Sequence, residues 1–397
     1  MFTIRTYNKI SPKGLDLLPA DLYHVSDAAE APDAILLRSQ SLHDVELPPS
    51  VKAVARAGAG VNNIPVERCA ERGIVVFNTP GANANSVKEL VLAGLFLSSR
   101  GIVEGVTWAR SLADRGDEVP ALVEQGKKQF KGPEILGKTL GVVGLGAIGV
   151  AVANAAVALG MHVVGHDPFI TVASAWGLSS DVRRASSLDA LLAESDYVTL
   201  HAPLTDDTRD LIDARALGRM RRGARLLNFA RGGLVDNAAV LRALDAGTLA
   251  RYVTDFPDAA LAGHAHVLPV PHLGASTPEA EDNCAVMAAR QLRDFLEHGN
   301  ITNSVNFPTC QMPEPAGRQR IVIANRNVPN MVGQITTVLA RHGINIADLL
   351  NQSARHYDLA YNIIDVDSAF GSEVLDELRA IDGVITVRGL QGTAVPA

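Results

Sequence analysis

Three glycines in the pattern Gly144-x-Gly146-x-x-Gly149 constrain the fold of this chain more than any other feature. They lie where the apolar run TLGVVGLG gives way to an alanine-rich stretch, AIGVAVANAAVALG. In a strand–turn–helix unit the first glycine permits the tight turn, the second lets backbone approach a pyrophosphate, and the third lets helix meet strand. The pattern predicts a Rossmann-like sheet with a dinucleotide at the helix N-terminus, against Gly144, Gly146, Ala147, Ile148 and Gly149.

An acidic residue at the next strand end favours one kind of dinucleotide. Asp167 stands 18 residues after the third glycine, at the end of the run HVVGHDP. A carboxylate there can accept hydrogen bonds from the adenosine ribose hydroxyls, and it would repel a 2′-phosphate. A lone GxGxxG arises by chance in glycine-rich turns, but the strand before it, the helix after it and Asp167 favour dinucleotide binding. We therefore expect NAD rather than NADP.

Apolar runs alternate with helical stretches in the first 76 residues and again from residue 138 to residue 272, which predicts two doubly wound parallel sheets. Two long helical stretches, ELVLAGLFLSSR and STPEAEDNCAVMAARQLRDFLEHG, connect these parts. The chain is therefore expected to leave its first domain and return to it. The predicted domains are a discontinuous one of residues 1–90 and 275–308 and a cofactor domain of residues 91–274.

A third unit follows a proline-rich segment. The stretch NFPTCQMPEPAGR carries three prolines and one glycine, and predicts a linker at residues 309–318. Residues 319–397 then show the order strand, helix, strand, strand, helix, strand. This βαββαβ order predicts a ferredoxin-like domain.

Composition excludes several other classes of protein. The chain has 397 residues, 47% of them apolar, and a formal charge of -7 without any long basic run, so a nucleic-acid partner is not expected. Cys69, Cys284 and Cys310 lie far apart without CxxC spacing, which favours neither disulfides nor a metal site. No apolar stretch of eighteen residues and no signal-like N-terminus is present, so no membrane association is expected and a reducing cytoplasmic location fits.

Two side chains at predicted strand ends carry acid–base or charge chemistry. Arg231 follows the run LLNFA, and its guanidinium could hold a carboxylate in a bidentate manner. His272 follows HVLPVP, and its imidazole could accept a hydroxyl proton near neutral pH. Read from the residues alone, an ordinary surface arginine and a structural histidine remain alternatives.

Several segments in order resemble the D-isomer-specific 2-hydroxyacid dehydrogenase family: GVVGLGAIG, HAPLT, NFARGGLVD and PHLGAST, preceded by ARAGAGVNNI and NTPGANANSVKEL. The resemblance covers nearly all of residues 1–308. It implies Arg231 as the clamp on the substrate carboxylate and carbonyl, His272 as the acid/base, and Asp255 as an active-site carboxylate. It also implies that the discontinuous domain binds substrate through Ala59, Gly60, Val61 and Asn83, and that NAD contacts include His201, Ala202, Pro203, Thr208, Ala230, Asp255 and Gly274.

One position departs from the family pattern. The family places a glutamate five residues beyond Asp255 to pair with the histidine, and this chain has Ala260 there. Either Asp258 takes over the orienting role, or His272 works without a fixed partner.

The substrate is expected to carry a phosphate. Arg38 and Arg56 stand at strand ends beside the proposed carboxylate loop, and Lys127, Lys128 and Lys131 could add positive charge, although each alone fits a solvated surface residue. Resemblance to the family's phosphoglycerate dehydrogenase branch implies NAD-dependent oxidation of 3-phospho-D-glycerate toward L-serine. Another 2-hydroxy acid, with 2-oxoglutarate as the matching oxoacid, and a sensor without turnover remain alternatives.

Residues 320–397 resemble an ACT domain, the amino-acid-sensing module of that branch. The resemblance implies L-serine as effector, with Asn327 and Asn345 at contact positions and Asn325 where histidine is usual. Turn and cap roles are the alternative for these asparagines. ACT sheets usually pair between subunits, so a homodimer or homotetramer is expected.

Overall fold

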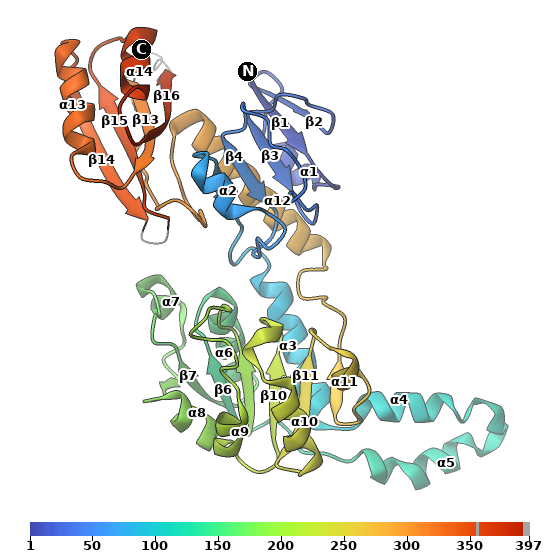
Figure 1. Cartoon of the computed structure of the whole chain (residues 1–397). Coiled ribbons are helices and arrows are strands. Elements are labelled where there is room, and N and C mark those ends of the chain that lie inside the picture. The colour runs from blue at the N-terminus through green and yellow to red at the C-terminus, as the bar shows by residue number, and fades with distance from the viewer. Residues whose placement is uncertain (316, 355–356, 392–397) are drawn as a thin grey trace. The chain divides into compact units, whose positions relative to one another are not determined.

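The computed structural model describes residues 1–315, 317–354 and 357–391, and the chain divides into two compact units. One unit comprises residues 1–83 and 281–397, and the other comprises residues 84–280. Both contain a parallel sheet with helices, and the first also contains a separate antiparallel sheet (Figure 1). The predicted fold class, two Rossmann-like parallel sheets plus a C-terminal βαββαβ unit, is confirmed.

The first parallel sheet has five strands in the order β2-β1-β3-β4-β5, and every pair is parallel. Its elements are β1 (Phe2–Thr6), α1 (Pro12–Leu15), β2 (Tyr23–Ser26), β3 (Ala34–Leu37), β4 (Ala53–Arg56), α2 (Val66–Glu71) and β5 (Val75–Phe77). Successive residues of β4 join different apolar clusters, Ala53 and Ala55 on one face and Val54 on the other. Both faces are therefore buried, as the continuous apolar runs predicted.

The second parallel sheet has seven strands in the order β12-β11-β10-β9-β6-β7-β8, again with every pair parallel. Apolar clusters lie on its two faces. Its elements are β6 (Thr139–Val143), α6 (Ala147–Ala158), β7 (His162–His166), α7 (Val172–Gly177), β8 (Val182–Arg184), α8 (Leu188–Glu194), β9 (Tyr197–Leu200), α9 (Ala214–Arg219), β10 (Ala224–Asn228), α10 (Asn237–Asp245), β11 (Leu249–Thr254), α11 (Ala259–Ala262) and β12 (Val267–Pro269).

An arm of short helices precedes this second sheet. After α3 (Ala84–Ser99), the helices α4 (Ile102–Arg110) and α5 (Val119–Gly126) extend away from the sheet (Figure 1). No single helix among the described residues is long and apolar enough to cross a membrane; only α3 and α4 together, bent by 71°, meet that test of length and composition.

The C-terminal sheet is antiparallel, with the strand order β14-β15-β13-β16. Its elements are β13 (Gln319–Arg326), α13 (Met331–Arg341), β14 (Ile346–Ala354), β15 (Leu359–Val366), α14 (Ser372–Arg379) and β16 (Val384–Gln391). One face packs on α13 and α14 through residues such as Ile321, Ile335 and Leu378. Residues 355–356 and 392–397 of the predicted C-terminal domain lie outside the described residues.

The other face of the C-terminal sheet shares a core with the five-stranded sheet. Val322 and Tyr361 lie in the same buried cluster as Phe77 and as Leu292 of α12 (Pro278–His298). Since each sheet buries apolar side chains against the same helix, the two form one hydrophobic core within the first unit.

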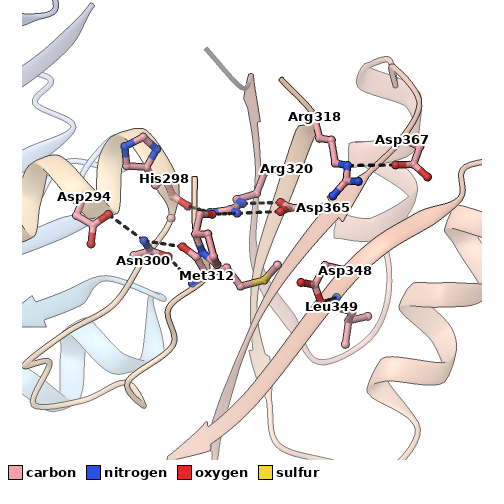
Figure 2. Close-up of polar contacts among 12 residues, drawn as sticks. Asp294, His298, Asn300, Met312, Arg318, Arg320, Asp348, Leu349, Asp365 and Asp367 are labelled. Carbon is pink, nitrogen blue, oxygen red and sulfur yellow. Dashed lines mark hydrogen bonds and ion pairs between the residues drawn. The ribbon is translucent and has the colours of Figure 1, made fainter. Parts of the chain in front are cut away.

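Polar contacts order the proline-rich segment between α12 and β13 (Figure 2). The side-chain amide of Asn300 donates to the Met312 carbonyl at 3.1 Å, and the Met312 N–H donates to Asn300 Oδ1 at 3.0 Å. Arg320, fully buried, donates to both carboxylate oxygens of Asp365 and to the carbonyls of His298 and Pro313. The segment predicted as a linker is therefore held to both α12 and β13.

We predict that Gly299→Ala destabilises the protein more than a matched glycine change. Gly299 has φ +77°, and an added Cβ would lie 2.4 Å from Val322 Cγ1, whereas Gly343 has φ +67° with nothing within 4 Å of that position. Positive φ alone costs about 1–2 kcal/mol, and the clash should add about 1–3 kcal/mol. Urea unfolding of Gly299→Ala and of Gly343→Ala measures the difference. Equal losses in the free energy of unfolding would contradict close packing of Gly299 against Val322.

Candidate active site

The candidate residues of the second unit gather at one edge of its sheet. Asp167 follows β7, Arg231 follows β10, Asp255 follows β11 and His272 follows β12. Because all the strands are parallel, their carboxyl ends lie along the same edge, where open α/β sheets bind their ligands.

The glycine motif has the geometry that a dinucleotide requires. Gly144 has φ +88°, and a Cβ on it would lie 2.7 Å from the His201 backbone. A Cβ on Gly149 would lie 2.0 Å from the Gly144 carbonyl oxygen, so only glycine lets α6 approach β6. Gly146, the N-cap of α6, has nothing within 4 Å of an added Cβ, which leaves space for a diphosphate.

Asp167 lines a cavity that suits an adenosine. Its two carboxylate oxygens accept hydrogen bonds from the N–H groups of Leu145 and Phe169, each at 2.8 Å. The cavity has a volume of about 310 Å³, and its lining includes Leu145, Asp167, Ile170, Val182 and Arg184. Fixed by two backbone donors, the carboxylate is oriented for ribose hydroxyls.

Four other predicted cofactor contacts, His201, Ala202, Pro203 and Thr208, follow β9. His201 accepts or donates one bond with Thr199, and burial lowers its pKa to about 3, so it is neutral at ordinary pH. Thr208 donates to the Pro203 carbonyl at 2.6 Å, which folds the segment after β9 back on itself. Ala202 is also close to the motif, because its N–H lies 2.8 Å from the position of a Cβ on Gly144.

Arg231 is placed by a residue that the sequence interpretation did not single out. The amide of fully buried Asn228 donates to the Arg231 carbonyl at 2.8 Å, and its oxygen accepts from the N–H groups of Ala230 and Arg231. The guanidinium itself is exposed and donates to the Ala230 carbonyl. The Asn-Phe-Ala-Arg segment thus fixes the arginine backbone while its head remains available.

Asp255 is the buried charge of this site. It is 3% exposed, and neither carboxylate oxygen has a hydrogen-bond partner among the described residues. Burial raises the pKa of Asp255 to about 6, while the charges of His272 and Arg231 oppose the rise. A Cβ on Gly274 would lie 3.9 Å from Asp255 Oδ2, so that predicted contact residue also borders the carboxylate.

The structure gives Asp258 a different role from the one considered for it. Its carboxylate caps α11 by accepting from the Leu261 N–H at 2.8 Å and also accepts from the Asn237 amide at 2.8 Å. The His272 ring instead packs edge-on against Phe256, with centroids 4.8 Å apart. Of these two carboxylates, Asp255 is therefore the one whose charge interacts with His272.

In the first unit, the loop after β4 presents backbone donors that lack partners within the described part of the chain. Within the described part of the chain, the N–H groups of Ala59, Gly60 and Val61 make no hydrogen bond. Asn78 donates to the Ala59 carbonyl at 2.7 Å and Asn63 donates to the Gln40 carbonyl at 2.7 Å, which fix the loop from outside. Successive N–H groups without a partner can donate to an anion such as a carboxylate.

Three of the cations predicted to bind substrate form hydrogen bonds or ion pairs within the protein. Arg56 donates to the Gly60 carbonyl and to the Arg38 carbonyl, so its head supports the loop. Arg38 forms an ion pair with Glu281 at 2.7 Å. Lys127 pairs with Glu124 on the exposed arm, while Lys128 and Lys131 are exposed there, as solvated charges would be. Asn83 keeps a buried side-chain oxygen without a partner among the described residues.

The predicted effector residues do not meet within one copy of the chain. Asn327 follows β13 at the sheet end marked by Leu359, whereas Asn345 precedes β14 at the opposite end, beside Val366. Asn345 donates to Asp367 at 2.8 Å. Asn325 is 1% exposed and lies in a ladder in which Asn351 donates to Asn362, Asn362 donates to Asn325, and Asn325 donates to the Arg326 carbonyl, each at 2.7 Å.

In the part of the chain that the structure describes, no three His, Cys, Asp or Glu side chains gather in a group that could hold a metal ion.

Comparison with known proteins identifies relatives of this chain. Residues 101–274 match the model described as "D-isomer specific 2-hydroxyacid dehydrogenase, NAD binding domain". The D-3-phosphoglycerate dehydrogenase of Mycobacterium tuberculosis (strain H37Rv) is 38% identical over 289 residues, which are 69% of this chain and 51% of that protein. The protein of the same name from Bacillus subtilis is 32% identical over 332 residues, 79% of this chain and 61% of that protein. This chain thus spans about half the length of the first of these relatives.

Solved structures agree. An NAD+-bound 3-phosphoglycerate dehydrogenase of Entamoeba histolytica has a TM-score of 0.60 at 25% identity, covering 77% of this chain and 98% of that one. A protein from Thermus thermophilus has a TM-score of 0.62 at 29% identity, covering 76% and 99%. The predicted family and NAD as cofactor are confirmed. Residues 101–274 belong to the NAD-binding domain of the D-isomer specific 2-hydroxyacid dehydrogenases, and over most of its length the chain is a homologue of the D-3-phosphoglycerate dehydrogenases.

Proposed function

We propose that the protein catalyses the NAD-dependent oxidation of 3-phospho-D-glycerate to 3-phosphohydroxypyruvate, the first step toward L-serine. The observation that carries this proposal is the set of Arg231, Asp255 and His272 at adjoining strand ends, on the same sheet edge as the glycine motif. The free N–H groups of residues 59–61 suit a substrate carboxylate. The names of the relatives supply the particular substrate.

The proposed mechanism divides the work among three side chains. His272 accepts the C2 hydroxyl proton, and NAD, when bound, accepts the hydride from the same carbon. Arg231 donates hydrogen bonds to the carbonyl oxygen as it forms. The Asp255 carboxylate offsets the positive charge that His272 gains, which replaces the glutamate that Ala260 cannot supply.

The proposal includes regulation by L-serine, which requires two copies of the chain. Because Asn327 and Asn345 lie at opposite sheet ends, a two-fold axis beside the sheet would bring Asn327 of one copy toward Asn345 of the other. Asn325 would act through the asparagine ladder rather than by touching the effector.

A homodimer or homotetramer is therefore part of the proposal, and the arm offers a second apolar surface for it: Ile102, Val103 and Val106 are 37%, 42% and 47% exposed. Cys69, Cys284 and Cys310 are free and buried, which suits the cytoplasmic setting expected for the enzyme.

The direct test is NADH absorbance on mixing the purified protein with 3-phosphohydroxypyruvate, with and without L-serine, and beside 2-oxoglutarate. We expect NADH oxidation with the phosphorylated oxoacid and its suppression by serine. Faster oxidation with 2-oxoglutarate would assign a different hydroxy acid, and no oxidation with either compound would overturn the enzymatic proposal.

Replacing His272 by Asn should remove the proton acceptor while leaving NAD binding intact. General acid–base catalysis contributes about 10²–10⁴-fold, so we expect kcat to fall by that range. Asp258→Asn is the matched control. Asp258 caps α11 by accepting from the Leu261 N–H, and asparagine is also a good helix N-cap. Steady-state kinetics with NAD titration measures both, and unchanged turnover in His272→Asn would remove this histidine from the mechanism.

Asp255 should make folding stability depend on pH in a direction opposite to that of most carboxylates. Its pKa is raised to about 6, so between about pH 4 and 6 the folded state binds more protons than the unfolded state. Stability from this group is thus full at low pH and is lost as pH rises through 6. Asp255→Asn should remove that loss. Its free energy of unfolding should then come to exceed that of the wild type by up to about 3 kcal/mol as the pH rises across this window. Urea unfolding at pH 4.5 and 7 measures it; an equal difference at both pH values would contradict the buried-carboxylate assignment.

A further inference from the structure

A second cavity lies at the amino ends of β4 and β5, away from the strand ends that carry Arg56 and the loop 57–63. Its volume is about 540 Å³, within the range of small-molecule sites. One wall comes from the segment before β4 and the turn between α2 and β5, and the other from α14 and β16 of the C-terminal sheet. It is lined by Pro49, Ser50, Val51, Lys52, Arg72, Gly73, Val75, Phe295, Val322, Tyr361, Arg379, Ile385, Thr386, Val387 and Arg388.

The lining is strongly positive. It contains Lys52, Arg72, Arg379 and Arg388, and no aspartate or glutamate. Two cations come from each wall, so like charges face each other across the cavity. Such an arrangement is unfavourable unless something of opposite charge reduces the repulsion.

Two of these cations lack a carboxylate partner among the residues described. Arg72 donates to the carbonyls of Leu47 at 2.9 Å and Pro48 at 3.2 Å. Arg388 donates to the Phe295 carbonyl at 3.0 Å and lies over the Phe295 ring, 4.1 Å from its centroid. These contacts fix both guanidinium groups without neutralising them, so their remaining N–H donors are already oriented.

The other two cations are paired only with carboxylates outside the lining. Lys52 forms an ion pair with Asp33, and Arg379 forms one with Asp376, whose side chain is 70% exposed. An exposed pair contributes little and exchanges readily with water. Arg379 can therefore turn toward an anion that enters the cavity.

We propose that this cavity binds a small anion carrying a phosphate group, held by Arg72 and Arg388 with Lys52 and Arg379 completing the charge. Arginine presents paired N–H donors that match the oxygens of phosphate, and the Thr386 hydroxyl lies in the same lining. Since the walls belong to two different sheets, the bound anion bridges the five-stranded sheet and the C-terminal sheet.

Hydrogen–deuterium exchange of the full chain tests the proposal segment by segment. Inorganic phosphate and glycerol 3-phosphate are compared with sodium chloride at equal ionic strength, which separates free phosphate from a phosphate ester. We expect several-fold slower exchange in residues 49–52 and 384–388 with at least one phosphate compound. Anions bound at the loop 57–63 would protect that loop instead.

The variant Arg72→Gln with Arg388→Gln should abolish this protection. Arg379→Gln, which removes an exposed ion pair and a long 3.4 Å bond to the Val387 carbonyl, should weaken it at least several-fold. Arg341→Gln on the exposed face of α13 is the control and should behave as wild type. Equal protection by chloride, protection by neither compound, or protection that persists in Arg72→Gln/Arg388→Gln and in Arg379→Gln would each overturn the proposal.

Discussion

Parallel strand pairing is the constraint on which both ligand sites depend. In each parallel sheet every strand points the same way, so residues separated widely in sequence meet at one edge. The carboxyl edge of the seven-stranded sheet collects Asp167, Arg231, Asp255 and His272. The amino edge of the five-stranded sheet instead receives the C-terminal sheet and, with it, the basic cavity. The candidate active site and the basic cavity therefore lie at opposite kinds of sheet edge, one at the carboxyl ends of parallel strands and the other at their amino ends.

The C-terminal sheet is joined to the rest of its unit by packing and by a buried charge. Tyr361 donates to the Gly299 carbonyl at 2.9 Å inside the shared core. Arg320 is fully buried, and such a charge is tolerable only because Asp365 and two carbonyls satisfy its donors (Figure 2). A sheet attached in this way transmits displacement to α12 more directly than one on a flexible linker would.

The sequence predicted most of the fold, because its signals are local. Alternating apolar runs and glycine spacing located both parallel sheets, and the βαββαβ order predicted for the C-terminal unit is the order that the structure has. Motif order also brought Arg231, Asp255 and His272 to one edge. Contacts between distant residues could not be predicted in the same way. Asp258 accepts hydrogen bonds from Asn237 and from the first turn of its own helix, and Arg388 donates to the Phe295 carbonyl. No spacing rule encodes which acceptor a long side chain reaches once the chain has folded, so these roles required the structure.

The asparagine ladder restricts how this sheet can change during evolution. Asn351, Asn362 and Asn325 each give one donor to the next group along, and two of them are almost completely buried. Replacing Asn362 by an apolar residue would remove the donor to the buried Asn325 oxygen, and replacing Asn351 would remove the donor to the buried Asn362 oxygen, which is costly in a core. The three positions should therefore vary together among related proteins, and a histidine at position 325 should be accompanied by a different residue at position 362.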